Sequence, residues 1–209
     1  MKLDLKKIEE TFGQRKPKLM GHYSYYAVLL PLVIQSGKLH VLFEVRSDNL
    51  KRQPGEVCFP GGRIEQHETR EECAIRETME ELNLRREDIT IINALDFINT
   101  YSDFTLYPFL GILRPEAVKE VSVNQEEVKE TFLVPLQYFL ETDPYVYHFD
   151  VIPDVKDDFP YEMINSQRGY NWRKGCSEVP IYHYEDRVIW GLTARIVQHF
   201  ALILKGERA

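Results

Sequence analysis

The chain has 209 residues, 44% of them hydrophobic and 12% aromatic, which is enough apolar material for one well-buried core. Its formal net charge of -7 is spread along the whole chain, which argues against a broad nucleic-acid surface but is compatible with metal cations that carry a polyanionic substrate. The cysteines are odd in number and lack a paired metal-ligand spacing, which argues against a disulfide framework or a zinc site and favours a reducing cytoplasm. We therefore expect a single domain over residues 1–209.

No signal-peptide core is visible at the N-terminus, and no segment reaches the roughly 18 apolar residues that span a bilayer, so we expect a soluble protein without a membrane partner. Residues 2–13 place Leu3, Leu5, Ile8 and Phe12 among charges, which predicts a short amphipathic helix ending near Gly13. It would form an N-terminal appendage. The runs 23–34 and 39–45 are rich in β-branched and aromatic residues and flank Ser36-Gly37, which predicts two strands joined in a hairpin.

The rest of the chain alternates between strand and helix patterns. A polar connection over 48–62 leads to a charged helix over about 69–82. Further strands are predicted at 89–99, 105–113, 129–134, 145–152 and 179–184. A short helix is expected at 135–140, and an amphipathic C-terminal helix carries Leu192, Ile196, Val197, Phe200 and Leu204. Residues 153–178 are expected to form a long irregular segment that carries substrate contacts.

The helix predicted at 69–82 has two distinct faces. Thr69 with Glu72 three residues later fits a capping box, so the helix should begin there. At 100° per residue, Ile75, Met79 and Leu82 gather on one face. The opposite face carries three carboxylates: Glu77, Glu80 and Glu81. Their mutual repulsion costs only roughly 0.2 to 0.5 kcal/mol per pair, so a solvated charged face is the alternative interpretation.

The context of these carboxylates favours a functional site. A glycine-rich turn ends at Gly62, six residues before Glu68, and Arg76 directly precedes the first front-face carboxylate. The whole segment resembles the box of the Nudix hydrolases, G-x5-E-x7-R-E-U-x-E-E-x-G-U with U apolar. The positions that match in register are Gly62, Glu68, Arg76, Glu77, Glu80, Glu81 and Leu84. The departures are Thr78 for an apolar residue and Asn83 for glycine, and asparagine tolerates a left-handed helix end well.

The resemblance implies the Nudix-type α/β/α sandwich with a mixed sheet, and an enzyme that hydrolyses a diphosphate linkage. It implies Glu77, Glu80 and Glu81 as ligands of Mg²⁺ or Mn²⁺, with Glu68 and Arg76 as orienting partners. The physical argument agrees, because Mg²⁺ takes oxygen ligands and combines a few carboxylates with substrate phosphates and water. Such an ion can polarise the phosphoryl oxygen and help generate hydroxide. A general base must also accept a proton, and Glu77 and Glu127 are the two candidates.

The segment from Leu42 to Gly62 narrows the substrate. It resembles the accessory signature of coenzyme A pyrophosphatases within the Nudix family, L-L-T-x-R-[SA]-x3-R-x3-G-x3-F-P-G-G. Aligned positions are Leu42, Arg46, Ser47, Gly55, Phe59, Pro60, Gly61 and Gly62, while Phe43, Glu44 and Lys51 replace Leu, Thr and Arg. Residues 124–136 and 189–194 are also similar to this subfamily, the latter to the start of its C-terminal helix.

The second resemblance implies hydrolysis of coenzyme A or a derivative to 3',5'-ADP and 4'-phosphopantetheine or its acylated form. It makes Arg46, Lys51, Gly61 and Gly62 candidate substrate contacts, although lysine lacks the bidentate fork of arginine. Arg46 could instead pair with a loop carboxylate such as Glu56, and residues 59–62 could serve as a rigid turn that presents the helix.

Other interpretations of the sequence remain open. Trp190 is interpreted as a core residue rather than a stacking platform. The alternative functions are hydrolysis of another nucleoside diphosphate derivative such as ADP-ribose, for which residues 153–178 could reshape the pocket, and a non-catalytic Nudix module that senses a nucleotide. The expected partner is a small molecule, and the oligomeric state is not predicted.

Overall fold

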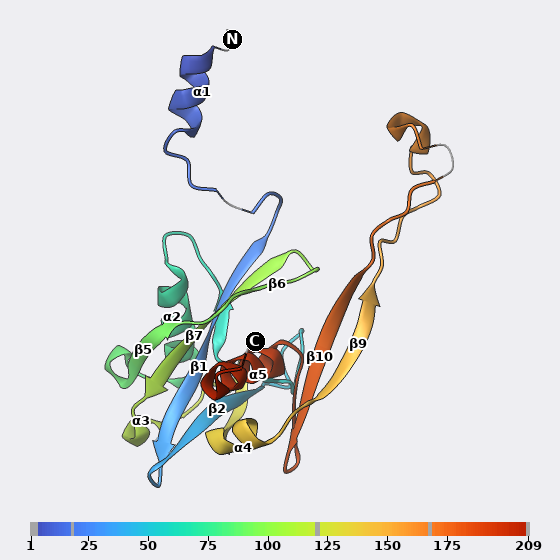
Figure 1. The fold of residues 1–209 in the computed structure, drawn as a ribbon. Coiled ribbons are helices and arrows are strands. Elements are labelled where there is room, and N and C mark those ends of the chain that lie inside the picture. Colours follow the sequence, from blue (N-terminus) through green and yellow to red (C-terminus); the bar gives the residue numbers. More distant parts are fainter. Residues whose placement is uncertain (1–3, 18, 120–121, 167–168, 208–209) are drawn as a thin grey trace.

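A mixed β-sheet forms the centre of the molecule in the computed structural model, which describes residues 4–17, 19–119, 122–166 and 169–207 (Figure 1). Its central strands run in the order β3-β2-β1-β7-β5, while β4, β6 and β8 pair with β1, β7 and β2. The strands are β1 (Ser24–Gln35), β2 (Lys38–Arg46), β3 (Val57–Cys58), β4 (Gly61–Arg63), β5 (Ile89–Ala94), β6 (Ile98–Asn99), β7 (Phe104–Leu113) and β8 (Val128–Pro135). β1 and β7 are parallel, and the other pairs of this sheet are antiparallel, so the predicted mixed sheet is confirmed.

The hairpin between β1 and β2 turns where the sequence predicts it. Gln35 pairs with Lys38, and the two turn residues Ser36 and Gly37 have φ values of 51° and 75°. Positive φ at both positions matches the twist of the flanking strands, which is the reason that small residues occupy such turns.

Helices cover both faces of the sheet, because the strand side chains alternate between two apolar clusters. On β2, Leu42 packs in the cluster with α2 (Arg70–Leu82), whereas Phe43 packs in the cluster with α4 (Leu136–Glu141) and α5 (Gly191–Lys205). The short α3 (Pro115–Lys119) lies on the α2 side, against β1. The chain is therefore an α/β/α sandwich, as expected.

A second, three-stranded antiparallel sheet follows in the order β11-β10-β9. Its strands are β9 (Tyr145–Val151), β10 (Gly175–Tyr184) and β11 (Arg187–Trp190). The chain between β9 and β10 projects away from the body as a hairpin arm that contains the 3-10 turn η2 (Tyr161–Ile164) (Figure 1). The aromatic rings of Phe159 and Trp172 meet there at 5.2 Å, so the arm packs on itself.

The arm corrects one expectation from the sequence. The sequence predicts an irregular segment over 153–178, but 175–178 belong to β10, and the described residues 153–166 and 169–174 extend the hairpin rather than covering the sheet (Figure 1). Residues 187–190 form the strand β11, so the C-terminal helix begins at Gly191. The predicted strand at 89–99 is divided into β5 and β6.

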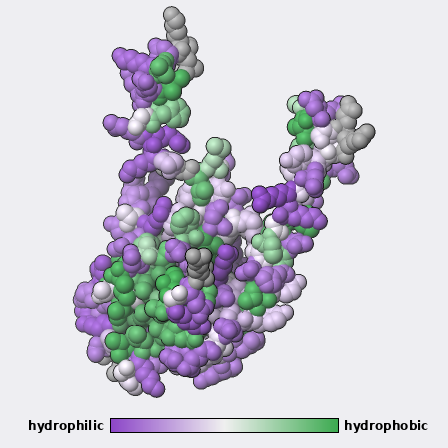
Figure 2. Space-filling model, viewed as in Figure 1, coloured by the Kyte–Doolittle hydropathy of each residue, from purple (hydrophilic) through white to green (hydrophobic). Residues whose placement is uncertain are grey.

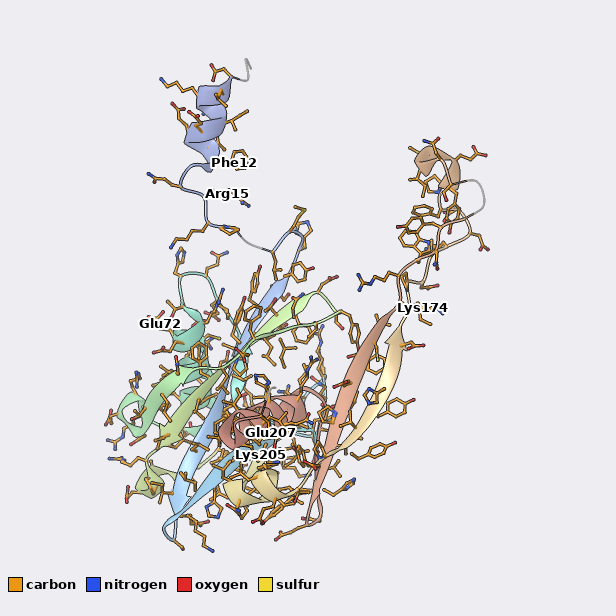
Figure 3. The ribbon with its side chains drawn as sticks, viewed as in Figure 1. Phe12, Arg15, Glu72, Lys174, Lys205 and Glu207 are labelled. Carbon is orange, nitrogen blue, oxygen red and sulfur yellow. The ribbon has the colours of Figure 1, made fainter. Side chains whose placement is uncertain are left out.

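The N-terminal helix α1 (Leu5–Phe12) also stands apart from the body (Figure 2). In Figure 3, the label Phe12 shows where this helix ends, and the label Lys174 shows where the arm meets β10. Asp4 caps it by accepting a hydrogen bond from the backbone N–H of Lys7 at 2.9 Å. Leu3, part of the predicted helix, lies outside the described residues. No helix in the described ranges is long and apolar enough to cross a membrane.

Candidate active site

The helix α2 begins and ends as its sequence predicts. The Thr69 hydroxyl accepts from the Glu72 backbone N–H at 3.2 Å, and the Glu72 carboxylate accepts from the Thr69 N–H at 2.7 Å, which completes the capping box (Glu72 is marked in Figure 3). At the other end, Asn83 adopts the left-handed conformation with φ 48°. Thr78 is buried and donates to the Ala74 carbonyl at 2.7 Å. Both departures from the motif are thus accommodated by the helix itself.

Arg76 holds three carboxylates in place. Its Nε and Nη2 donate to the two carboxylate oxygens of Glu68 at 3.1 and 2.9 Å, a bidentate contact. Its Nη1 lies 2.9 Å from Glu77 Oε1 and 3.2 Å from Glu80 Oε2. The hydrogen bond from Arg76 lowers the pKa of Glu68 to about 2, so this carboxylate stays ionised. Arg76 therefore fixes the loop before α2 to the helix and orients Glu77.

The three helix carboxylates differ in their surroundings. Glu81 is 5% exposed and accepts a hydrogen bond from the Gly61 N–H at 2.8 Å, whereas Glu80 is 53% exposed. Burial raises the pKa of both Glu81 and Glu77 above the ordinary carboxyl value. The anionic face of the helix is thus not a solvated surface, because Glu81 points into the protein against β4.

Two carboxylates from other elements join this group. Glu127 lies in the turn before β8, and the turn is tied to α2 by a hydrogen bond from the Asn124 N–H to the Glu81 carbonyl at 2.9 Å. Glu44 lies in the middle of β2 and is 1% exposed. Burial raises the pKa values of Glu44 and Glu81, and repulsion from neighbouring carboxylates, Glu77 and Glu127 among them, raises both further. We call these four residues the carboxylate cluster.

Glu44 is a member of the cluster that the sequence motifs do not indicate. It was noted as a replacement for threonine, but the informative feature is an acidic residue inside the otherwise apolar run 41–45. A carboxylate in a central strand is rarely buried without a partner.

The cluster fits a divalent cation by its chemistry, because its carboxylate oxygens are the ligands that Mg²⁺ and Mn²⁺ prefer. Among the residues that the structure describes, no three His, Cys, Asp or Glu side chains converge closely enough to hold an ion as they stand. Glu77 points to Arg76, and Glu81 points to the Gly61 N–H. Glu44 Oε2 is buried without any hydrogen-bond partner. An unpartnered oxygen of this kind is what a missing cation would leave behind.

A cavity of about 410 Å³ adjoins the cluster. Cys58 and Gly61 connect the two: the Cys58 thiol donates to Glu44 Oε1 at 3.1 Å, the Gly61 N–H donates to Glu81, and both residues line the cavity. Tyr101 and Trp190 also line it. Trp190 is 44% exposed, so its interpretation as a core residue is wrong; it ends β11 and precedes α5, where its ring borders the cavity.

The basic residues predicted to contact substrate are separated by the structure. Arg46 lines the cavity just after a β-bulge in β2, and its Nη2 donates to the Arg52 carbonyl at 3.4 Å while its buried Nε has no partner. Glu56 accepts instead from Gln53, so the predicted alternative of an Arg46–Glu56 ion pair is not formed. Lys51 is exposed and does not line the cavity.

The two predicted glycines have different places. Gly61, with φ 158°, packs so tightly on β1 that an added Cβ would lie 2.6 Å from the Val28 Cα. Gly62 lies against the Glu77 carboxylate. Gly61 thus reaches both the cavity and Glu81, while Gly62 provides the space that Glu77 occupies.

Comparisons with known proteins show what the chain is similar to. Residues 26–155 match the model of the NUDIX domain. The chain is 34% identical over 199 residues to the peroxisomal coenzyme A diphosphatase NUDT7 of Mus musculus, covering 91% of this chain and 76% of that protein. It is 30% identical to the uncharacterized Nudix hydrolase NudL of Photorhabdus laumondii, covering 88% and 87%. Among solved structures, a C. elegans Ap4A hydrolase binary complex is similar at 23% identity and a TM-score of 0.45, covering 55% of this chain and 81% of that one.

Proposed function

The chain belongs to the Nudix family and is a pyrophosphohydrolase, and from this premise we propose that it hydrolyses the diphosphate bond of coenzyme A or a derivative. The products would be 3',5'-ADP and 4'-phosphopantetheine or its acylated form. The observation that carries the proposal is the position of Arg46, a residue of the accessory signature, in a cavity lined by Cys58 and Gly61, which donate hydrogen bonds to Glu44 and Glu81 of the carboxylate cluster. The relative NUDT7, named as a coenzyme A diphosphatase, supports the same substrate.

Hydrolases of this family generally require divalent metal ions. In this chain, Glu77 and Glu81 would hold a Mg²⁺ or Mn²⁺ ion, with Glu80 at the exposed rim. An ion bound there would polarise a phosphoryl oxygen and lower the pKa of a bound water. Arg76 contributes by fixing Glu77, and the Gly61 N–H does the same for Glu81.

The proton of the attacking water has two candidate acceptors, Glu77 and Glu127. Burial raises the pKa of Glu77, which brings it closer to the range in which a carboxylate accepts a proton efficiently at neutral pH. Glu127 is exposed, and its carboxylate accepts from the Asn124 side chain at 3.2 Å. The pH profiles of the Glu77→Gln and Glu127→Gln variants distinguish them, because removal of the base abolishes the acidic limb of the profile.

We propose that Arg46 recognises the 3'-phosphate, which distinguishes coenzyme A from dephospho-coenzyme A. A guanidinium with an unused donor suits a phosphate dianion. Loss of one charged hydrogen bond costs about 1.5 to 3 kcal/mol, so Arg46→Ala should lower kcat/KM on coenzyme A roughly ten- to hundredfold. The efficiency on dephospho-coenzyme A should change little, and Lys51→Ala should cost less than Arg46→Ala. An equal loss on both substrates would assign Arg46 a structural role instead.

A substrate panel tests the proposed function. Purified protein is incubated with coenzyme A, ADP-ribose and a dinucleoside polyphosphate in the presence of Mg²⁺ or Mn²⁺, and kcat/KM is measured for each. The proposal requires the highest kcat/KM on coenzyme A or an acyl derivative. A higher value on ADP-ribose would assign the site to a different nucleoside diphosphate, and no turnover on any of them would indicate a binding module.

A further inference from the structure

The side chain of Glu44 is placed on the same face of the sheet as α2. Strand alternation puts it beside Leu42, which packs in the α2 cluster, and away from Phe43, which packs in the α5 cluster. Its backbone is held between β3 and β8, where Glu44 pairs with Cys58 on one side and Thr131 on the other. The carboxylate is therefore fixed in a central strand and directed toward the helix that carries Glu77 and Glu81.

The two oxygens of Glu44 have different surroundings. Oε1 accepts from the Cys58 thiol at 3.1 Å, and Oε2 has no partner although the residue is 1% exposed. Burying a carboxylate without a full set of partners is costly, and a thiol is a weak donor. Arg46 offsets part of this cost by its positive charge, but the negative charges of Glu77 and Glu127 add to it. Glu44 Oε2 therefore lacks the positive charge or hydrogen-bond donor that would stabilise a buried carboxylate oxygen.

We propose that Glu44 is a further carboxylate ligand of the divalent-cation site, contributed by β2 on the face of the sheet that α2 covers. The accessory signature has threonine at this position, so this chain has one carboxylate more than the signature prescribes. Additional carboxylates raise the affinity of an oxygen site for hard cations, because affinity follows the number of charged ligands. The inference rests on the metal dependence of the proposed function and not on its substrate.

The alternative is that Glu44 and Glu81 share a proton and that Glu44 does not coordinate the cation. The two cases differ in the variant Glu44→Gln. A glutamine can donate to Glu81 as a protonated carboxyl does, so the alternative leaves cation affinity unchanged. A glutamine removes the charge of a ligand, so the proposal requires a loss of affinity.

The experiment measures Mn²⁺ binding by electron paramagnetic resonance on the full chain without substrate. Glu44→Gln should raise the Kd for Mn²⁺ roughly ten- to hundredfold, which is the effect of losing one charged contact. Glu71→Gln is the matched control, because Glu71 is an exposed carboxylate on the same helix α2 and its loss changes the net charge equally. Its Kd should stay within about twofold of wild type, because exposed charges are screened.

Thermal unfolding provides the second readout and guards against a folding defect. In EDTA, Glu44→Gln and Glu44→Thr should be at least as stable as the wild type, because an unpartnered buried charge is removed. The rise in Tm on adding Mn²⁺ should be smaller in both variants than in the wild type. Glu44→Thr, which suits a β-strand, keeps the test valid if the glutamine variant misfolds.

Several results would overturn the inference: wild-type Mn²⁺ affinity in both Glu44 variants, an equal loss in Glu71→Gln, or no Mn²⁺ binding by the wild type. If Mn²⁺ affinity depends on Glu44 but coenzyme A is not hydrolysed, the inference holds and the proposed substrate is wrong. The two failures are thus distinguishable.

Discussion

The substitution Gly62→Ala tests how the loop before α2 positions Glu77. A Cβ at Gly62 would lie 2.6 Å from Glu77 Oε2 and closer still to Oε1 and Cδ. An ordinary contact begins at 3.4 Å, so the carboxylate must move by about 1 Å or more, away from its place beside Arg76. A misplacement of about 1 Å at a reacting centre costs about a hundredfold in rate, or roughly 2.7 kcal/mol of activation free energy.

The effect of Gly62→Ala on stability should be small, because the clash is with the end of a flexible side chain and the φ of Gly62 lies outside the left-handed region. We expect Tm to fall by less than about 4 °C, equivalent to roughly 1 kcal/mol. Gly61→Ala should instead destabilise the fold strongly, since its Cβ would meet the β1 backbone at Val28. Gly175→Ala, whose Cβ would meet an ordinary contact at 3.6 Å, is the benign control.

The assay is kcat on coenzyme A with saturating Mg²⁺, measured in a double-mutant cycle with Glu77→Gln. Because Gly62→Ala acts through Glu77, its effect should largely vanish in the Glu77→Gln background. Wild-type kcat in Gly62→Ala would refute the reasoning. So would fully additive losses in the double variant, because these would show that Gly62 acts elsewhere.

Three other predictions follow from the same site. Glu77→Gln and Glu81→Gln should each lose most of the metal-dependent activity, while Glu80→Gln should lose less because Glu80 is half-exposed. Wild-type activity in all three variants would contradict the metal assignment. Glu68 has its pKa lowered by Arg76, so its stabilisation is present above about pH 4.5 and lost as the pH falls toward 2. The Tm deficit of Glu68→Gln should therefore be larger at pH 7 than at pH 2.5, and a pH-independent deficit would contradict this. Asn83→Ala should lower the free energy of unfolding by about 1 kcal/mol and Asn83→Gly should be near neutral, as chemical denaturation can show.

Local features of the structure could be predicted because their causes are local in sequence. The capping box at Thr69, the turn at Ser36-Gly37 and the helix end at Asn83 each depend on a few neighbouring residues. The grouping of Glu77 with Glu81 follows from the helix period alone. These elements formed where the sequence predicts them.

The remaining features depend on contacts between distant segments. Glu44 comes close enough to Glu81 for their charges to repel because the sheet register places β2 beside β1 and β8, and no local pattern encodes that register. Trp190 was misinterpreted because the four-residue strand β11 exists through its pairing with β10, which turns the residue toward the cavity rather than the core. Lys51 fits the signature in spacing, yet the loop geometry leaves it exposed and away from the cavity.

The most direct test of the proposed function is hydrolysis of coenzyme A in ¹⁸O-labelled water, followed by mass spectrometry of the products. Water attack within the diphosphate bridge predicts 3',5'-ADP and 4'-phosphopantetheine, with one ¹⁸O atom in one of the two, and no reaction after the metal is chelated. Inorganic phosphate as the primary product, or turnover that persists in EDTA, would contradict the account.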